Sequence, residues 1–201
     1  QLSWYEEKGI EYMNGVEAQS IDAKNRFVAT SEGREIPYDS LIITTGGDVN
    51  TLPFSQREIA YFRGLEDADQ IKTLISELKL RPEGERHMLI YGGGFITMEF
   101  ANMCEYYDLK GTIVMRSDGF WSKALTQQAS DLLASHSKSK GVDVHFGTEI
   151  RLVMGGESVE GVLLNNGEEI PAKMIGAGIG IHTERPLLEG VGLEIGVGIK
   201  V

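Results

Sequence analysis

The chain has 201 residues, and its 19 lysines and arginines against 30 aspartates and glutamates give a formal net charge of −11. A charge of this sign argues against nucleic acid and anionic membranes as partners, because both are themselves negative. A hydrophobic content of 41% is typical of a globular protein, and no apolar run approaches the roughly 20 residues of a membrane helix.

The chain begins with Gln1 and shows neither an initiator methionine nor a secretory leader. We therefore expect a cytoplasmic protein, of which this sequence is a piece. The next residues read as short strands separated by turns, at 9–14, 16–22, 26–31 and 35–37. The apolar, β-branched run at 40–45 ends in two glycines, and such a run predicts a buried parallel strand. Residues 48–62 read as a connection.

From residue 65 the pattern alternates between helix and strand. The first helix has apolar residues at helical spacing, at Ile71, Leu74, Ile75 and Leu78, and it ends at 81–84. Further strands are expected at 87–91, 111–115 and 142–146, with helices at 95–108 and 127–140 between them. Short connections between alternating elements predict that these three strands are parallel neighbours with both helices packed on the sheet.

Hairpin signals follow the third of these strands. The glycines and asparagines at 155–156 and 165–167 separate apolar segments at 149–154, 159–164 and 168–170, so we expect a β-meander. Another apolar run, at 173–179, ends at Gly180. Residues 32–46 and 166–180 share a pattern of Gly, Glu-Ile-Pro and a later Gly, which indicates two nucleotide-binding units of one design, only the second being complete here.

The sharpest signal is the glycine turn at 92–94, which follows an expected strand and opens an expected helix. Gly92 permits the tight turn. Gly94 lets a pyrophosphate approach the helix N-terminus, where free N–H groups and the helix dipole favour anions. Thr97 stands where a third glycine would complete the dinucleotide pattern, and its β-branch should push the helix away from its strand. A structural turn without a ligand is the alternative interpretation.

The choice between dinucleotides normally depends on the end of the second strand, about 20 residues later. Met115 cannot usefully accept hydrogen bonds from the ribose diol of NAD, whereas Arg116 offers a fork of donors to the 2′-phosphate of NADP. This mildly favours NADPH. The alternative for Arg116 is a solvated charge at a strand end.

Four segments together resemble the FAD-dependent pyridine nucleotide-disulfide oxidoreductase family, especially its rubredoxin and ferredoxin reductase and nitrite reductase large-subunit branches. These segments are 35–46, 63–68, 92–99, and 180–181 with 192–195. The resemblance extends over essentially the whole chain in order and spacing. It implies an α/β protein with a Rossmann-like FAD/NAD(P)-binding fold, in which a central parallel sheet is combined with helices and a β-meander.

The resemblance also implies a division into domains. Residues 1–62 would be a partial segment of a FAD-binding domain, residues 63–178 an NAD(P)-binding domain, and residues 179–201 the return into the FAD-binding domain. The family's two flavin motifs belong before Gln1 and after Val201. FAD is therefore expected in the full-length protein and not in this chain alone.

Individual cofactor contacts follow from the same resemblance. Phe95 lies at the aromatic position that covers the nicotinamide pocket until the cofactor enters, and Glu99 lies at the position that faces the nicotinamide and the flavin. The alternative for Phe95 is a core aromatic at a helix start. The alternative for Glu99 is a charge near the helix N-terminus that the helix dipole stabilises. The complete set of expected cofactor-binding residues is Gly92, Gly93, Gly94, Phe95, Ile96, Glu99, Arg116, Gly180, Thr45 and Gly46.

The function implied is that of a fragment of a FAD-dependent NAD(P)H oxidoreductase, inactive alone. In the full-length protein, for which a homodimer is one expected state, a hydride would pass from NAD(P)H to flavin and on to an unidentified small redox protein or small molecule. The alternative is a diverged, non-catalytic nucleotide-binding or interaction module. Thr97 and Lys173, which depart from the family pattern, favour that alternative.

Other chemistries find little support in the sequence. The histidines at 87, 136, 145 and 182 share no metal-ligand spacing, so we expect no metal. The single cysteine, Cys104, excludes an internal disulfide and is expected in the core. No serine lies in a nucleophile elbow, which argues against an α/β-hydrolase. A methyltransferase is disfavoured as well, because it would need a carboxylate near Met115. We expect no catalytic residue from the chain itself.

Overall fold

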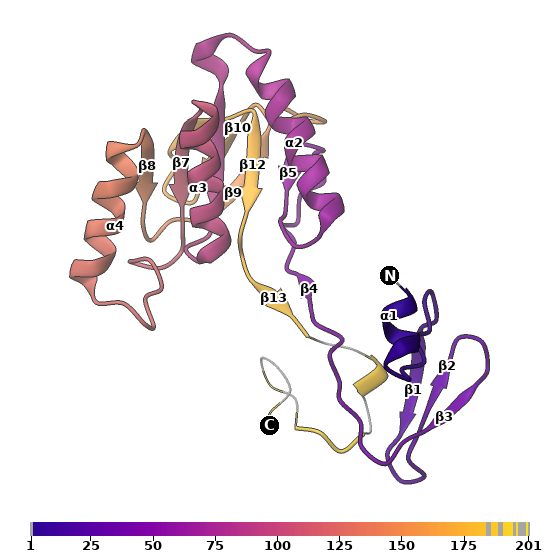
Figure 1. The fold of residues 1–201 in the computed structure, drawn as a ribbon. Helices are drawn as coiled ribbons and strands as arrows, with labels where there is room; N and C mark the ends of the chain where they lie inside the picture. The colour runs from indigo at the N-terminus through magenta and orange to yellow at the C-terminus, as the bar shows by residue number, and fades with distance from the viewer. Residues whose placement is uncertain (1, 184–185, 189–190, 195, 197–199, 201) are drawn as a thin grey trace. The chain divides into compact units, whose positions relative to one another are not determined.

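A computed structural model describes residues 2–183, 186–188, 191–194, 196 and 200. The chain forms two compact units, one of residues 1–48 with 182–201 and one of residues 49–181. The elements of both can be followed in Figure 1. Within the described residues, no helix is long and apolar enough to cross a membrane.

The larger unit is built on a five-stranded sheet with the strand order β5-β12-β6-β7-β8. The strands are β5 (Ile59–Ala60), β6 (His87–Tyr91), β7 (Lys110–Val114), β8 (Val142–His145) and β12 (Met174–Ala177). Every pairing in this sheet is parallel. The expected parallel neighbours at 87–91, 111–115 and 142–146 are therefore confirmed, and so is the expected fold class.

The two faces of this sheet are covered by different elements. Helices α2 (Leu65–Lys79), α3 (Phe95–Tyr107) and α4 (Gln127–Ser139) pack on one face (Figure 1). The antiparallel meander of β9 (Ile150–Met154), β10 (Gly161–Leu164) and β11 (Glu169–Pro171) packs on the other, as expected. A short 3₁₀ turn, η1 (Glu83–Glu85), precedes β6.

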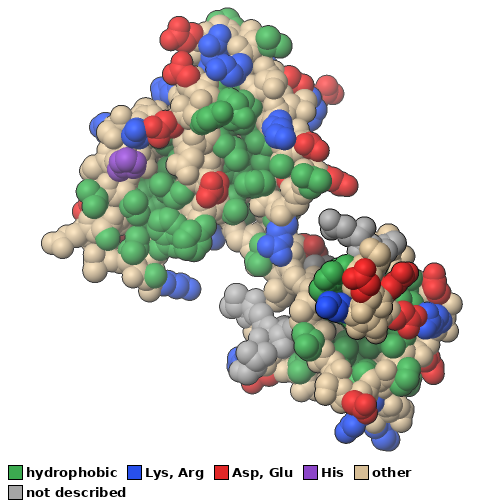
Figure 2. Space-filling view, in the orientation of Figure 1, with side chains coloured by type: hydrophobic (Ala, Val, Ile, Leu, Met, Phe, Trp, Pro, Cys, Tyr) green, Lys and Arg blue, Asp and Glu red, His purple; other side chains and the backbone are tan. Residues whose placement is uncertain are grey.

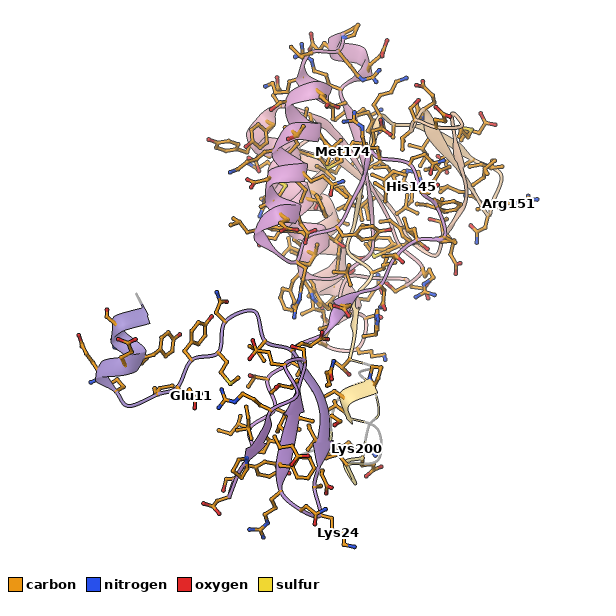
Figure 3. All side chains as sticks on the ribbon, turned by 90° about the vertical axis from the view of Figure 1, so that its right-hand side faces the viewer. Glu11, Lys24, His145, Arg151, Met174 and Lys200 are labelled. Atoms are coloured by element: carbon orange, nitrogen blue, oxygen red, sulfur yellow. The ribbon has the colours of Figure 1, made fainter. Side chains whose placement is uncertain are left out.

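Alternate residues of each strand enter two separate cores. Met88 and Ile90 of β6 join the core under the helices, while Leu89 and Tyr91 join the core under the meander. This alternation follows from strand geometry, in which successive side chains point to opposite faces. Figure 3 shows Arg151 of the meander pointing outward, away from both cores.

His87 is a buried histidine at the start of β6. It is only 4% exposed, and its Nε2 lies 2.9 Å from Thr112 Oγ1 on β7. Burial and, to a smaller extent, the charge of Lys110 lower the pKa of His87 to about 4, and Asp143 partly opposes both effects. The imidazole is therefore neutral in the folded chain at neutral pH.

We expect His87 to make the chain less stable in acid. Between the unfolded pKa of about 6.5 and the folded pKa of about 4, the unfolded chain binds one more proton, so the stability from neutral His87 is lost as pH falls. The loss is about 3 kcal/mol across this window. Urea unfolding at pH 7 and pH 4 measures it. His87→Gln, which cannot titrate, should lack this component, and an identical pH dependence in both proteins would contradict the assignment.

The smaller unit contains a three-stranded antiparallel sheet of β1 (Ala18–Asp22), β2 (Phe27–Thr30) and β3 (Glu35–Pro37). Lys24 lies in the turn between β1 and β2 (Figure 3). The helix α1 (Leu2–Glu7) precedes this sheet, and the 3₁₀ turn η2 (Pro186–Leu188) lies near the end of the chain. Strands β4 (Asp48–Val49) and β13 (Ile181–His182) form a two-stranded sheet.

Three expectations for the first 62 residues are wrong. Residues 9–14 are not a strand, and α1 precedes them instead. The run at 40–45 is not a strand either, and Ile42 is 85% exposed. A β-branched run forms a strand only beside another strand, and the sheets of the described residues offer this run no neighbour. The two residues of β5 were missed because so short a strand leaves no periodic pattern.

Candidate functional site

The carboxyl ends of β6, β7 and β12 border one open cleft of about 600 Å³. The turn at 92–94 follows β6, residues 115–117 follow β7, and residues 178–180 follow β12, and all three segments line the cleft. Parallel strands bring their carboxyl ends to the same edge of a sheet, where ligands of open α/β sheets bind. Five expected site residues therefore meet in one place, namely Gly92, Gly93, Gly94, Arg116 and Gly180.

The presence of glycine at each of the three positions of the turn has a different structural explanation. Gly92 has a φ of +135°, and a Cβ there would lie 2.3 Å from the carbonyl oxygen of Gly178. A Cβ on Gly93 would lie 2.9 Å from Met115 Sδ. Gly94 has an ordinary extended backbone, and a Cβ there would meet nothing within 4 Å. Packing thus requires glycine at 92, a Cβ at 93 would need the Met115 side chain to shift, and Gly94 keeps open the space in front of α3.

The first turn of α3 has no cap of its own. Its N-cap residue Gly94 makes no side-chain hydrogen bond, and the turn contains no acidic residue. The other long helices differ, because Asp67 accepts a hydrogen bond from Gly64 N–H before α2 and Thr126 accepts one from Ala129 N–H in α4. The uncapped N–H groups and the dipole of α3 together favour an anion in the cleft.

Arg116 and Lys123 bring positive charge to the cleft. Both line it and both are exposed, and within the described part of the chain neither makes a hydrogen bond or an ion pair. Burial raises the pKa of the nearby Tyr91 phenol, Glu149 raises it further, and Arg116 lowers it. Lys123 was not among the residues predicted from the sequence, although a second basic residue in the loop after Arg116 is a signal for it.

Thr97 does not push α3 away from the sheet. Its side chain is completely buried, and it fits because Gly92 and Gly178 beside it have no side chains. A Cβ on Gly92 would lie 2.9 Å from Thr97 Oγ1, and a Cβ on Gly178 would lie 3.0 Å from the Thr97 nitrogen. The expectation of a displaced helix was wrong because a glycine far away in the sequence, Gly178, provides the space.

The remaining expected residues do not line the cleft. Phe95 is 77% exposed, so it is not a core aromatic, and that alternative is wrong. Ile96 packs close to Gly178, and Glu99 lies on an exposed part of α3. Thr45 and Gly46 belong to the smaller unit, in the segment that is not a strand.

Cys104 is a core residue of α3. It is fully buried, and burial raises the pKa of its thiol to about 12, so the reactive thiolate is strongly disfavoured. Among the residues that the structure describes, no three His, Cys, Asp or Glu side chains form a group that could hold a metal ion.

The described residues of the smaller unit contain no glycine turn of the kind that holds flavin phosphates. Flavin phosphates would need a glycine turn between a strand and a helix, as in the larger unit. The glycines at 46–47 follow no strand and precede no helix among these residues, and a Cβ on Gly47 would lie 2.5 Å from the carbonyl oxygen of His182. No step involving flavin is therefore assigned to these residues.

Comparisons with known proteins identify the family. Residues 3–201 match the model of the pyridine nucleotide-disulphide oxidoreductases. The chain belongs to this family. Its relatives include monodehydroascorbate reductase 2 of Oryza sativa subsp. japonica, 32% identical over 98% of this chain and 42% of the relative, and a rubredoxin-NAD(+) reductase of Pseudomonas putida, 26% identical over 99% of this chain and 51% of the relative.

Solved structures of this family share the fold. A ferredoxin reductase of Rhodopseudomonas palustris matches with a TM-score of 0.86 and 22% identity, over 99% of this chain and 48% of that one. Putidaredoxin reductase, solved in a covalent complex with putidaredoxin, matches with a TM-score of 0.83 and 24% identity, over 98% of this chain and 48% of that one. This chain therefore spans about half the length of the family members it matches.

Proposed function

We propose that this chain supplies the NAD(P)H-binding part of a flavin-dependent oxidoreductase. The observation that carries the proposal is the cleft at the carboxyl ends of β6, β7 and β12. It combines a glycine turn in which packing restricts Gly92 to glycine, an uncapped helix N-terminus and two cations without partners in the described part of the chain. Each of these features favours a phosphorylated ligand.

The geometry suggests an orientation for the dinucleotide. Gly94 leaves room for the pyrophosphate in front of the N–H groups of α3. Arg116 and Lys123 lie beyond β7 and would hold the 2′-phosphate on the adenosine half. The nicotinamide half would then extend toward Gly178 and Gly180, beyond β12. Bound NADPH would supply a hydride, and the chain's own residues would hold and orient it.

The electron acceptor is proposed from the relatives. One relative is named for rubredoxin, and another family structure contains putidaredoxin, so a small redox protein is favoured as the final acceptor. Flavin is proposed for the full-length protein, in the domains expected at 1–62 and 179–201, around the NAD(P) domain expected at 63–178. A non-catalytic nucleotide-binding or interaction module is the second candidate, because Thr97 and Lys173 depart from the family pattern.

We expect this chain to bind NADPH about ten- to a hundredfold more tightly than NADH, because a charge-assisted hydrogen bond is worth about 1.5–3 kcal/mol. Solvent screening at exposed Arg116 and Lys123 reduces the preference toward the lower figure. Arg116→Ala and Lys123→Ala should each weaken NADPH binding, and the double variant should abolish the preference. Binding of NADH should stay nearly unchanged. Titration calorimetry measures all of these affinities.

Arg151→Ala is the matched control, since Arg151 is an exposed arginine on the outer side of the meander (Figure 3). It should leave both affinities unchanged. Equal affinity of the unmutated chain for NADPH and NADH would reduce Arg116 and Lys123 to surface charges. Binding of neither dinucleotide would contradict the proposed function and favour the non-catalytic module.

A further inference from the structure

Two Asn-Gly pairs occur in the sequence, Asn14-Gly15 before β1 and Asn166-Gly167 in the hairpin turn between β10 and β11. An Asn-Gly pair is chemically reactive, because the glycine has no side chain to hinder attack of its backbone nitrogen on the asparagine amide. Both glycines have the positive φ typical of such turns, +74° at Gly15 and +88° at Gly167. The two pairs are therefore alike in sequence and local backbone, and they differ in what surrounds them.

The pair at Asn166-Gly167 is held by hydrogen bonds of the meander. Gly167 N–H donates to the Leu164 carbonyl at 3.1 Å, so the hydrogen that the attacking nitrogen must lose is already engaged. Asn166 Oδ1 accepts from Glu168 N–H at 3.0 Å, which restricts rotation of the asparagine side chain. The turn has to open before the nitrogen can attack, so the fold protects this pair.

The pair at Asn14-Gly15 has no such protection. Both residues are exposed, and within the described part of the chain neither makes a hydrogen bond. A Cβ on Gly15 would meet nothing within 4 Å, so no neighbouring atom restricts this turn. The Asn14 amide and the Gly15 nitrogen can therefore approach each other as they would in an unfolded peptide.

We infer that Asn14 is a site of spontaneous deamidation and that the fold protects Asn166 from the same reaction. The Gly15 nitrogen bonds to Cγ of Asn14 and closes a five-membered succinimide ring, while the Cγ–Nδ2 bond breaks and ammonia leaves with the hydrogen of the Gly15 N–H. Water then opens the ring at either of its carbonyls and gives aspartate or isoaspartate. Water is the only co-reactant, and no group is oxidised or reduced.

The inference is independent of the proposed function, because residues 14 and 15 belong to the smaller unit and the cleft belongs to the larger one. Each deamidation adds one negative charge to the net charge of −11. Figure 2 shows that Asp and Glu side chains already gather on the side of the smaller unit at which α1 lies. The new carboxylate therefore joins a surface that is already acidic.

The isoaspartyl product also lengthens the main chain by one methylene group. Arg34 Nη1 donates to Glu11 Oε1 at 3.0 Å and lies 3.9 Å from Met13 Sδ, so it holds the segment just before Asn14. The extra length falls between this attachment and the start of β1 at Ala18. Deamidation thus alters both the charge and the geometry of the entry into the three-stranded sheet.

Peptide mapping of the full chain tests the inference. Trypsin releases Asn14 in the peptide 9–24 and Asn166 in the peptide 152–173, because within each range Lys or Arg occurs only at the end. The folded chain is incubated at pH 8, and tandem mass spectrometry follows the gain of about one mass unit at each asparagine. We expect Asn14 to deamidate at least about fivefold faster than Asn166, the cost of breaking one hydrogen bond, and to give isoaspartate among its products.

Unfolding in urea separates protection by the fold from the chemistry of the two sequences. In urea Asn166 should accelerate toward the rate of Asn14, whereas the rate at Asn14 should change little. Asn14→Gln should remove the mass gain from the peptide 9–24, because glutamine would have to close a less favourable six-membered ring. Asn166→Gln is the matched control and should leave the rate at Asn14 unchanged.

Three results would overturn the inference. Equal rates at the two asparagines in the folded chain would show that the fold does not distinguish them. A strong acceleration of Asn14 in urea would show that the fold protects Asn14 as well. Formation of aspartate without isoaspartate at position 14 would rule out the succinimide route.

Discussion

Replacing Gly92 with alanine is expected to destabilise the chain by about 3 kcal/mol or more. Left-handed backbone strain contributes about 1–2 kcal/mol for a residue with a Cβ, and overpacking contributes about 1–3 kcal/mol. The new methyl group would lie 2.3 Å from the Gly178 carbonyl oxygen and 2.9 Å from Thr97 Oγ1, at a φ of +135°. Both contacts lie where β6, α3 and the end of β12 meet. A shift of the backbone that relieved one of these contacts would therefore shorten the other. Urea unfolding measures the loss.

Gly94→Ala is the matched control for this substitution, two residues away. Its backbone is extended and the added methyl group would meet nothing within 4 Å, so the free energy of unfolding should change by less than about 1 kcal/mol. Binding of NADPH should weaken instead, because the methyl group enters the space in front of α3. If Gly92→Ala proved as stable as Gly94→Ala, the packing account of the turn would be incorrect.

The second large effect is expected in the core beneath α3. Phe100 is fully buried, and its ring fills the space beside Gly176 of β12, where a Cβ would lie 2.6 Å from ring atoms. Phe100→Ala should cost about 3–5 kcal/mol through lost burial and the cavity it leaves. Gly176→Ala should cost about 1–3 kcal/mol through overpacking.

The double variant distinguishes direct packing from two independent losses. With Phe100 truncated, the methyl group of Gly176→Ala meets open space, so the double variant should be less destabilised than the sum of the single variants. Urea unfolding of all four proteins provides this cycle. Strict additivity would show that the ring and Gly176 do not share the space that the structure assigns to them.

The sequence was most informative where local patterns repeat. Alternating helix and strand segments predicted the parallel neighbours β6, β7 and β8, because short right-handed crossovers allow few other arrangements. The meander was predictable from its glycine and asparagine turns. The glycine turn was predictable because its position between strand and helix is itself part of the pattern.

Errors arose where the outcome depends on residues distant in the sequence. The run at 40–45 has the composition of a strand, yet strand formation depends on a neighbour that composition cannot reveal. Thr97 looked too large for a helix that packs closely on its strand. Gly178, which follows β12 and lies 81 residues after Thr97, leaves space for it.

Within the candidate site, the missed residues lie in a loop without periodicity. Lys123 reaches the cleft because its loop is attached to the glycine turn by the hydrogen bond from Trp121 N–H to the Gly93 carbonyl, and no spacing rule describes that contact. Thr45 and Gly46 were assigned by resemblance alone, and they lie in the smaller unit, outside the residues that line the cleft. Their cofactor-binding role stays a prediction.

The central claim, that NADPH binds at the carboxyl ends of β6, β7 and β12, is tested most directly by amide chemical-shift mapping. The ¹⁵N-labelled chain is titrated with NADPH and its amide shifts are followed. The account predicts that the largest changes fall at 93–96, 116–123 and 178–180, while the amides of β1, β2 and β3 stay unchanged. Changes confined to the three-stranded sheet, or no saturable change at all, would contradict it.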